Sequence, residues 1–263
     1  MFRINRETSE VMPDTIMMIE NFKITNSTLT SILILFIFIL ICFFVIRKYK
    51  LRPNKSQSAV EILIESMFNL IKQITASEKY ARVLFPLIAT IFVYIGFSNL
   101  ISLIPGLMSI TINDISLFRS PTTDFNTTFG LAIGSVVLTN VVSIKDWGFF
   151  GHLGKFFKFK DIYLGFKKNI KSGFMAMIDF AIGLLDIVGE LAKIISLSLR
   201  LFGNMYAGEI LATLILGSFA YVIPILWTTM SLLSGVIQAI VFGSLTTAYY
   251  MLAVKIKEGE ESG

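Results

Sequence analysis

The sequence predicts an all-α polytopic membrane protein, and three observations support that fold class. Hydrophobic residues make up 54% of the 263 residues, and the mean hydropathy is +0.74. Several apolar runs approach the length of about 20 residues that a helix needs to cross a bilayer. Phe occurs 24 times and Pro only six times, which favours helices. We therefore expect a single membrane domain over residues 1–263, with about five membrane-embedded helices.

The first expected span covers residues 29–46, which are almost entirely apolar. Residues 1–27 do not resemble a signal peptide, because the apolar run starts late and no small-residue cleavage site follows it. Five Lys and Arg residues lie between Arg47 and Lys55. Positive loops remain in the cytoplasm, so this pattern places the N-terminus outside.

Residues 56–77 are expected to form an amphipathic helix on the inner membrane surface. Charged residues such as Glu61, Glu65 and Lys72 separate apolar residues that recur at helical spacing. The apolar members are Val60, Leu63, Ile64, Met67, Phe68 and Ile71. Such a face can rest in the membrane interface or bind a partner, and contact with the membrane is the favoured interpretation.

Two further spans are expected at residues 83–104 and 125–144. The second leads into a basic loop, residues 145–171, which contains seven Lys residues and His152. The positive charge of this loop places it in the cytoplasm. Within such a loop, His152 is expected to be solvated or interfacial rather than a proton carrier.

Residues 174–221 form the longest expected helix. It must be strongly tilted or broken, because its length far exceeds the roughly 30 Å of hydrocarbon in a bilayer. Pro224 marks a turn, and residues 225–256 are expected to form the return helix. Lys255 and Lys257 precede an acidic tail and predict a cytoplasmic C-terminus.

The long helix carries charged residues within an apolar sequence. They are Asp186, Glu190, Lys193, Arg200 and Glu209. A charge at bilayer depth costs about 2.5–3.5 kcal/mol by insertion scales, and such residues usually mark ion or proton pathways. Arg200 is the most informative of them, because a guanidinium cannot be deprotonated in a protein and remains a fixed positive charge.

Helical geometry orders these side chains around Arg200. Asn204 and Lys193 share its face, whereas Glu209 lies on the opposite face and roughly 13 Å further along the axis. This arrangement suits two aqueous pockets separated by an electrostatic barrier. The charges could instead be paired for structure in a buried helix, or the helix could lie on the membrane surface. The apolar residues that flank Arg200 argue against full exposure.

The segment S-L-R-L-F-G-N-M-Y-A-G-E-I-L, residues 198–211, resembles the signature of subunit a of the F-type ATP synthase. The resemblance implies that Arg200 faces carboxylates on a rotating c-ring. It also implies that Asn204 supports the arginine and that Glu209 lies in a proton half-channel. The last two helices would then form a tilted, near-horizontal hairpin wrapped around the ring.

Other positions match the same family. The N-L-x-x-L-x-P pattern from Asn99 to Pro105 and the segment 119–128 resemble family segments. The resemblance implies that Asn99 and Asp124 line the outer half-channel, although Asp124 could equally be a helix N-cap. Asp186 matches an acidic position fourteen residues before the arginine, and Glu190 is an additional candidate on the inner side.

The return helix departs from some members of the family. Those members place a histidine seven residues before a glutamine, and this sequence has Ser231 seven residues before Gln238. Any proton relay past Ser231 must therefore use carboxylates, hydroxyls and water. The sequence leaves open whether the coupling ion is a proton or sodium, because the ion's ligands would sit on the ring.

The predicted function is that of a proton-conducting stator subunit, which is not itself an enzyme. No Walker sequence is present, and Cys42 is the only cysteine, so we expect no nucleotide site, no cofactor and no Cys-based metal site. The basic residues flank apolar runs, which favours membrane topology over nucleic-acid binding. The expected partners are the c-ring, the peripheral-stalk b subunits and the lipid bilayer, in a bacterial plasma membrane rather than a mitochondrion.

Two other functions compete with this one. A secondary transporter would carry inverted repeats and pairs of Gly- or Pro-broken helices, and the sequence shows no such repeat. A purely structural membrane subunit is the third possibility, and co-purification with a c-ring separates the first interpretation from both.

Overall fold

The computed structural model describes residues 12–19, 22–47, 50, 53–102, 110–112, 115–147, 170–218 and 223–261. Helices dominate this part of the chain, which confirms the all-α membrane class. The helices are α1 (Asn26–Arg47), α2 (Lys55–Thr75), α3 (Glu78–Ser102), α4 (Phe125–Trp147), α7 (Ile170–Ser218) and α8 (Ile223–Glu261). The basic loop expected over 145–171, including His152, lies outside the described residues except at its two ends.

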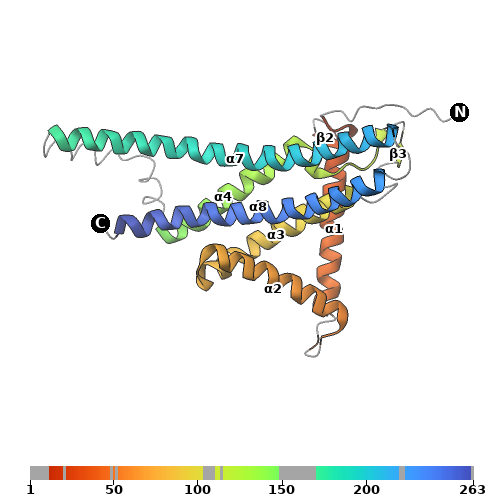
Figure 1. Ribbon diagram of the computed structural model, residues 1–263, viewed down its shortest axis with the longest axis horizontal. Helices are drawn as coiled ribbons and strands as arrows, with labels where there is room; N and C mark the ends of the chain where they lie inside the picture. Colours follow the sequence, from red (N-terminus) through yellow and green to blue (C-terminus); the bar gives the residue numbers. More distant parts are fainter. Residues whose placement is uncertain are drawn as a thin grey trace.

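Two short hairpins and a 3-10 turn were not expected from the sequence. The strands β1 (Thr15–Ile19) and β2 (Phe22–Thr25) pair antiparallel immediately before α1. The strands β3 (Thr111–Ile112) and β4 (Ile115–Ser116) form a second pair, and η1 (Pro121–Thr123) follows it. These segments lie at the end of the molecule where α1 and α4 begin and α3 ends (Figure 1).

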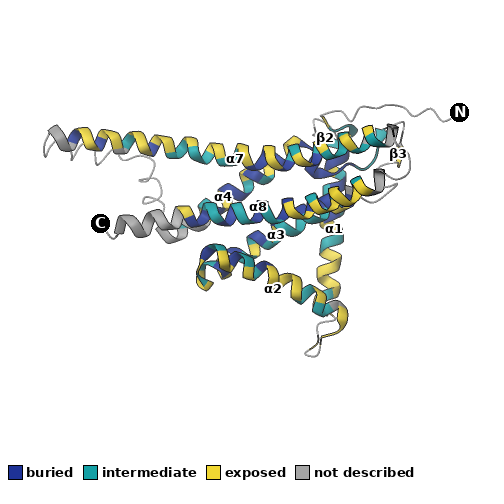
Figure 2. Cartoon of the chain, in the orientation of Figure 1, coloured by how far each residue is buried: buried dark blue, intermediate teal, exposed yellow. Residues whose placement is uncertain are grey.

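Three helices are long and apolar enough to cross a membrane, among the residues that the structure describes. They are Asn26–Arg47, Glu78–Ile101 and Leu226–Leu252, and Phe125–Val141 is a shorter apolar helix. Along α1, the residues beyond the first two turns are largely exposed (Figure 2). An exposed apolar surface of this kind is stable only in contact with lipid or with another membrane helix.

The helices α7 and α8 form a long hairpin. They lie side by side and run across the direction of α1 (Figure 1). The 49 residues of α7 would extend roughly 73 Å as one helix, more than twice the hydrocarbon thickness of about 30 Å. Because α7 is one continuous helix, it cannot stand perpendicular to the membrane, and the hairpin must be strongly tilted.

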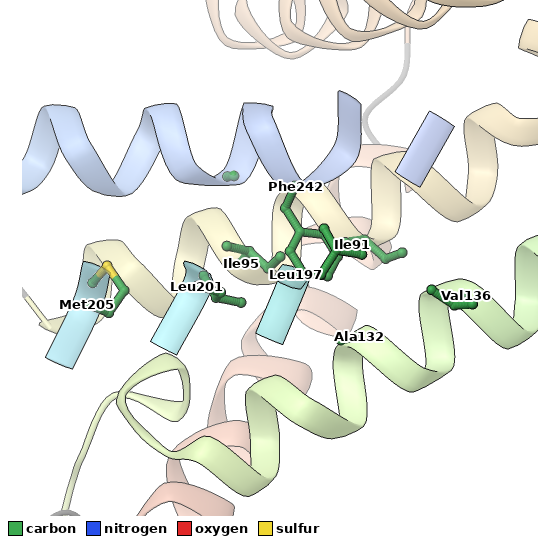
Figure 3. Packing of buried hydrophobic residues seen from close by; sticks show 9 residues of the cluster. Ile91, Ile95, Ala132, Val136, Leu197, Leu201, Met205 and Phe242 are labelled. Carbon is green, nitrogen blue, oxygen red and sulfur yellow. The ribbon is translucent and has the colours of Figure 1, made fainter. Parts of the chain in front are cut away.

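A hydrophobic core fixes this hairpin to α3 and α4. In Figure 3 the side chains of Phe242, Leu197 and Ile91 meet at the centre of the cluster. Its buried members are Ile91 and Ile95 from α3, Ala132 and Val136 from α4, Leu197, Leu201 and Met205 from α7, and Ala239 and Phe242 from α8. Leu197 and Leu201 bracket Arg200 in sequence, so their burial fixes the rotation of α7 about its axis.

The apolar face of α2 divides between the protein and the surroundings. Near its end, Ile71 is buried in a second cluster with Leu84 of α3 and Tyr250 of α8. Nearer its start, Ile62, Leu63 and Ile64 are exposed. The second half of α2 therefore packs on the chain itself, and only the first half offers an apolar surface for the membrane interface.

A residue in the left-handed region ends α2. Ala76 has a φ of 52°, and its backbone N–H donates to the Lys72 carbonyl at 2.9 Å. This backbone conformation favours glycine, because a Cβ approaches the following carbonyl oxygen. The turn is held by the Thr75 hydroxyl, which donates to the Ser77 carbonyl at 3.0 Å, and by the buried cluster that contains Ile71 before the turn and Ala81 after it.

Ala76→Gly is expected to stabilise the protein by roughly 0.5–1 kcal/mol, because glycine removes the Cβ strain at a positive φ. Thermal unfolding of the detergent-solubilised protein measures the effect. The matched control is Ala59→Gly, at an exposed position inside α2, where glycine should destabilise the helix by a similar amount. A lower unfolding temperature for Ala76→Gly would contradict the strain.

Candidate functional site

Arg200 lies on an exposed surface of α7 that is otherwise mainly apolar. Its neighbour Leu199 is exposed, and Leu211 and Leu214 continue the exposed surface toward the end of the helix. On α8, Leu233 and Ile237 are also exposed. The apolar residues around Arg200 suit contact with lipid or with another protein rather than with bulk water. The charge of Arg200 therefore does not serve solubility.

The structure records no hydrogen bond or ion pair for the Arg200 side chain with any residue that it describes. The guanidinium is therefore not enclosed in an ion pair within that part of the chain. A membrane arginine usually pairs with a carboxylate or a carbonyl of its own bundle. Its exposure instead leaves its five N–H donors available to a group on another molecule.

Asn204 is held by α8 one turn beyond Arg200. The Asn204 Nδ2 atom donates to the Ser234 hydroxyl at 2.8 Å, and that hydroxyl lies 3.1 Å from Asn204 Oδ1. Both side chains lie at the exposed side of the hairpin. The expected support of Arg200 by Asn204 is not a direct contact in this structure, and the amide instead joins the two helices beside the arginine.

Glu209 occupies the opposite face of α7, as the helical spacing predicts. Phe202 and Tyr206 share that face, and their rings stack at 5.1 Å between centroids. Phe125, at the start of α4, meets Phe202 edge-on at 5.6 Å. Glu209 itself is half-buried, and its Oε2 atom is inaccessible to solvent. One carboxylate oxygen thus lies inside the protein, on the face of α7 where Phe202 meets the start of α4.

Two turns before Arg200, Lys193 is paired. Its Nζ atom lies 2.7 Å from Glu190 Oε1, one turn earlier on α7. The same Nζ lies 5.3 Å from the centroid of the Tyr249 ring on α8. Asp186 is half-buried a further turn back along α7. The charges before Arg200 are therefore an ion pair and a separate carboxylate.

On the return helix, Gln238 is 6% exposed, and its Nε2 atom has no hydrogen-bond partner among the described residues. A buried amide of this kind calls for a water molecule or a moving partner, since an unmade hydrogen bond costs about 1–3 kcal/mol. Ser231 is half-buried two turns earlier. Both residues lie on α8, the helix whose Ser234 is hydrogen-bonded to Asn204.

Asn99 bridges three elements. Its Nδ2 atom donates to the Gly235 carbonyl of α8 at 2.9 Å, and its Oδ1 atom accepts from the Thr122 hydroxyl of η1 at 2.7 Å. The approach to α8 is close, because a Cβ placed on Gly235 would lie 3.0 Å from Asn99 Cβ. Its contact point on α8, Gly235, thus lies about one helical turn before Gln238.

Asp124 is the N-cap of α4. Its Oδ1 atom accepts from the Asn126 backbone N–H at 3.0 Å, and its Oδ2 atom accepts from the Thr127 hydroxyl at 3.1 Å. The Ser27 hydroxyl of α1 donates to the same Oδ2 at 2.7 Å. The carboxylate is 4% exposed. The capping role considered from the sequence is therefore present, and a position in a half-channel stays a prediction.

Asn99 and Asp124 belong to one buried group, which we call the polar cluster. Its members, all buried, are Asn26, Ser27, Thr30, Asn99, Arg119, Ser120, Thr122, Thr123 and Asp124. Arg119 ties the cluster to the N-terminal segment, since its Nη1 atom donates to the Met12 carbonyl at 3.0 Å. The structure brings Asn99 and Asp124 into this cluster, which Asn99 joins to Gly235 of α8, and it places the Glu190–Lys193 pair elsewhere, beside Tyr249.

Several partners of the expected residues were missed from the sequence. Ser234 could have been found, because it lies between Ser231 and Gln238 at helical spacing. Tyr249, Ser27 and Thr122 gave no local signal, because their partners are distant in sequence. Among the described residues, no three His, Cys, Asp or Glu side chains come together as a metal site.

The comparisons with known proteins all point to one family. The family model for the ATP synthase A chain matches residues 28–251. ATP synthase subunit a of Desulforamulus reducens is 34% identical over 205 residues, which cover 75% of this chain and 66% of that protein. ATP synthase subunit a of Campylobacter concisus is 32% identical, covering 81% of this chain and 82% of its own. ATP synthase subunit a 2 of a Picosynechococcus species is 26% identical over 96% of this chain.

Gly235→Ala is expected to destabilise the protein by roughly 1–3 kcal/mol, because the added methyl group overpacks the α3–α8 contact. Asn99 cannot move aside freely, since both ends of its amide are hydrogen-bonded. Thermal unfolding in detergent measures the change. Gly134→Ala on α4 is the control, because a Cβ there meets nothing within 4 Å, and it should not lower the unfolding temperature. Equal stability of the two variants would show that the contact is not tight.

Proposed function

The chain belongs to the family of ATP synthase subunit a, the proton-translocating subunit of the membrane sector, and we propose that Arg200 separates two half-channels that a rotating c-ring connects. One observation carries the proposal. Arg200 is an exposed cation on a mainly apolar surface and is not ion-paired within the described chain. Such a charge is suited to meet a carboxylate that arrives on another subunit.

Arg200 acts by Coulomb attraction. A carboxylate of the ring that approaches the guanidinium is favoured in its ionised form, so it gives up its proton on reaching Arg200. The same fixed positive charge repels a proton that would pass directly from one side to the other. Because Arg200 cannot be deprotonated, it does not itself carry the proton.

The outer half-channel runs along the face of α7 opposite Arg200. We assign it Glu209, whose carboxylate is directed into the protein, together with Ser231 and Gln238 of α8. Asn99 and Asp124 border it from the polar cluster, with Asp124 as the more structural of the two because it caps α4. The buried Gln238 amide supports this assignment, since it provides a hydrogen-bonding group for water in an otherwise apolar core.

The inner half-channel lies toward the start of α7. We assign Asp186 as its half-buried carboxylate. Glu190 lies beside it on the inner side, where it is paired with Lys193 and does not pass on protons. Asn204 acts beside Arg200, where its bond to Ser234 fixes the spacing of α7 and α8. A single charge crossing gains about 2.3 kcal/mol per 100 mV, so rotation must accumulate several transfers for each ATP.

The exposed surfaces support the proposed partners. The c-ring packs against the exposed apolar side of the α7–α8 hairpin around Arg200. The exposed length of α1 contacts lipid and the membrane helices of the peripheral-stalk b subunits. The chain carries no ATP chemistry, which belongs to other subunits. It lies in a bacterial plasma membrane with the N-terminus outside and the C-terminus in the cytoplasm.

Arg200→Ala is expected to abolish coupled ATP synthesis while passive proton flux through the complex persists, because the barrier between the half-channels is lost. The reconstituted complex in liposomes reports both rates. Arg82→Ala is the control, since Arg82 is an exposed arginine paired with Glu78 on α3, and it should leave both rates unchanged. Normal ATP synthesis by Arg200→Ala would refute the role.

Glu209→Gln is expected to slow proton flux and ATP synthesis together, because the amide cannot pass on a proton. The measurement is the initial rate of proton uptake driven by a membrane potential. Glu65→Gln, at an exposed position of α2, serves as the matched control. A wild-type rate for Glu209→Gln would remove this residue from the pathway.

A further inference from the structure

The hairpin contains a second cation that the proposed mechanism does not use. Between residues 186 and 252, the sequence has two positively charged residues, Lys193 and Arg200. Lys193 lies seven residues before Arg200, so the two side chains project within about 20° of one another around the helix and roughly 10 Å apart along it. A rotor that passes along this surface would therefore approach both.

The two cations differ in their exposure and in their ion pairing. Arg200 is exposed and is not ion-paired within the described chain. Lys193 lies 2.7 Å from Glu190 Oε1, and the two side chains are only 21% and 18% exposed. The Tyr249 ring covers the ammonium group at 5.3 Å. A half-buried ion pair is screened less by water than a surface pair, so Glu190 neutralises most of the Lys193 charge.

We infer that Glu190 and Tyr249 mask the charge of Lys193, so that Arg200 is the single cation that a rotor carboxylate meets on the described part of this surface. This inference rests on the function proposed above. An unmasked ammonium would offer the ionised carboxylate a second resting place about two turns from the first. A rotor carboxylate within a few ångströms of that ammonium would be held there by Coulomb attraction. The rotor would then pause at the wrong position.

This role differs from that of a proton carrier. A carrier at position 190 must take up and release a proton. A masking carboxylate must remain ionised and needs only its charge and its position. The two roles predict opposite results when Lys193 is neutralised together with Glu190, because the mask is needed only while the cation is present.

The test uses the complete ATP synthase complex, reconstituted in liposomes. Glu190→Gln keeps the shape of the side chain and removes its charge, and it should lower ATP synthesis by about tenfold or more if the exposed ammonium attracts rotor carboxylates. The double variant Glu190→Gln with Lys193→Gln should return the rate to within about twofold of wild type, as a coupled pair requires. The amount of assembled complex is measured for each variant.

A charge-swapped variant, Glu190→Lys with Lys193→Glu, covers the case in which Glu190→Gln fails to assemble. It keeps a neutral pair and should retain most of the activity, whereas a proton carrier at position 190 would be lost. Glu78→Gln is the matched control, because it breaks a surface ion pair with Arg82 on α3 and should have no effect.

The outcomes distinguish a failure of the masking role from a failure of the proposed function. Equal impairment of Glu190→Gln and the double variant, or a wild-type rate for Glu190→Gln, would overturn the masking role. So would an inactive swapped variant that assembles normally. Arg200→Ala is measured in the same preparation. If that variant loses coupled synthesis while the double variant is not rescued, only the masking role fails. If Arg200→Ala synthesises ATP normally, the proposed function itself fails.

Discussion

The arrangement of the α7–α8 hairpin depends on the free-energy cost of holding a permanent charge in an apolar environment. The Arg200 guanidinium cannot shed its proton to escape that cost. It could be neutralised by a carboxylate of its own bundle, but it would then be unavailable to any other molecule. In this structure the charge is left exposed, and the helix that bears it is fixed in rotation by Leu197 and Leu201, which are buried against three other helices. The core supplies stability, and the charge remains exposed, as the proposed contact with a rotor requires.

Polar contacts between α7 and α8 occur on both sides of that charge. Asn204 bonds to Ser234 on one side, and Lys193 lies over Tyr249 on the other. Interactions of this kind are modest individually, since helix-to-helix hydrogen bonds in membranes are worth about 0.6 kcal/mol on average. Their value here is geometric. They set the register of two antiparallel helices across about three turns of α7 around Arg200, and a register shift would move the arginine relative to anything that packs on the hairpin.

The polar cluster solves a related problem at the end of the molecule where α1 and α4 begin. Many hydroxyl, amide and charged groups are buried there, and in an apolar surrounding each must find a partner within the protein. Ser27 and Thr127 satisfy Asp124, Thr122 satisfies Asn99, and Arg119 bonds to the N-terminal segment. The Gln238 amide differs, because its Nε2 atom stays without a partner among the described residues. The Ser98 and Ser198 hydroxyls are likewise without a partner among those residues, so these three groups, unlike the polar cluster, are available to water.

The sequence alone determined the class of the protein, the positions of its helices and the motif around Arg200. These features follow from apolar runs, helical spacing and the exclusion of charge from lipid, which are all local. It could also place Asn204 and Glu209 on opposite faces of one helix. Only the tertiary structure decided which charges are paired and which are exposed. Glu190 was only a candidate for the inner side in the sequence, and the structure pairs it with Lys193 on the same helix. Asp124 proves to be a cap that also accepts from Ser27 of α1, 97 residues away. The reason is that a hydrogen bond or ion pair is set by atoms within a few ångströms, and those atoms can come from residues nearly a hundred positions away along the chain.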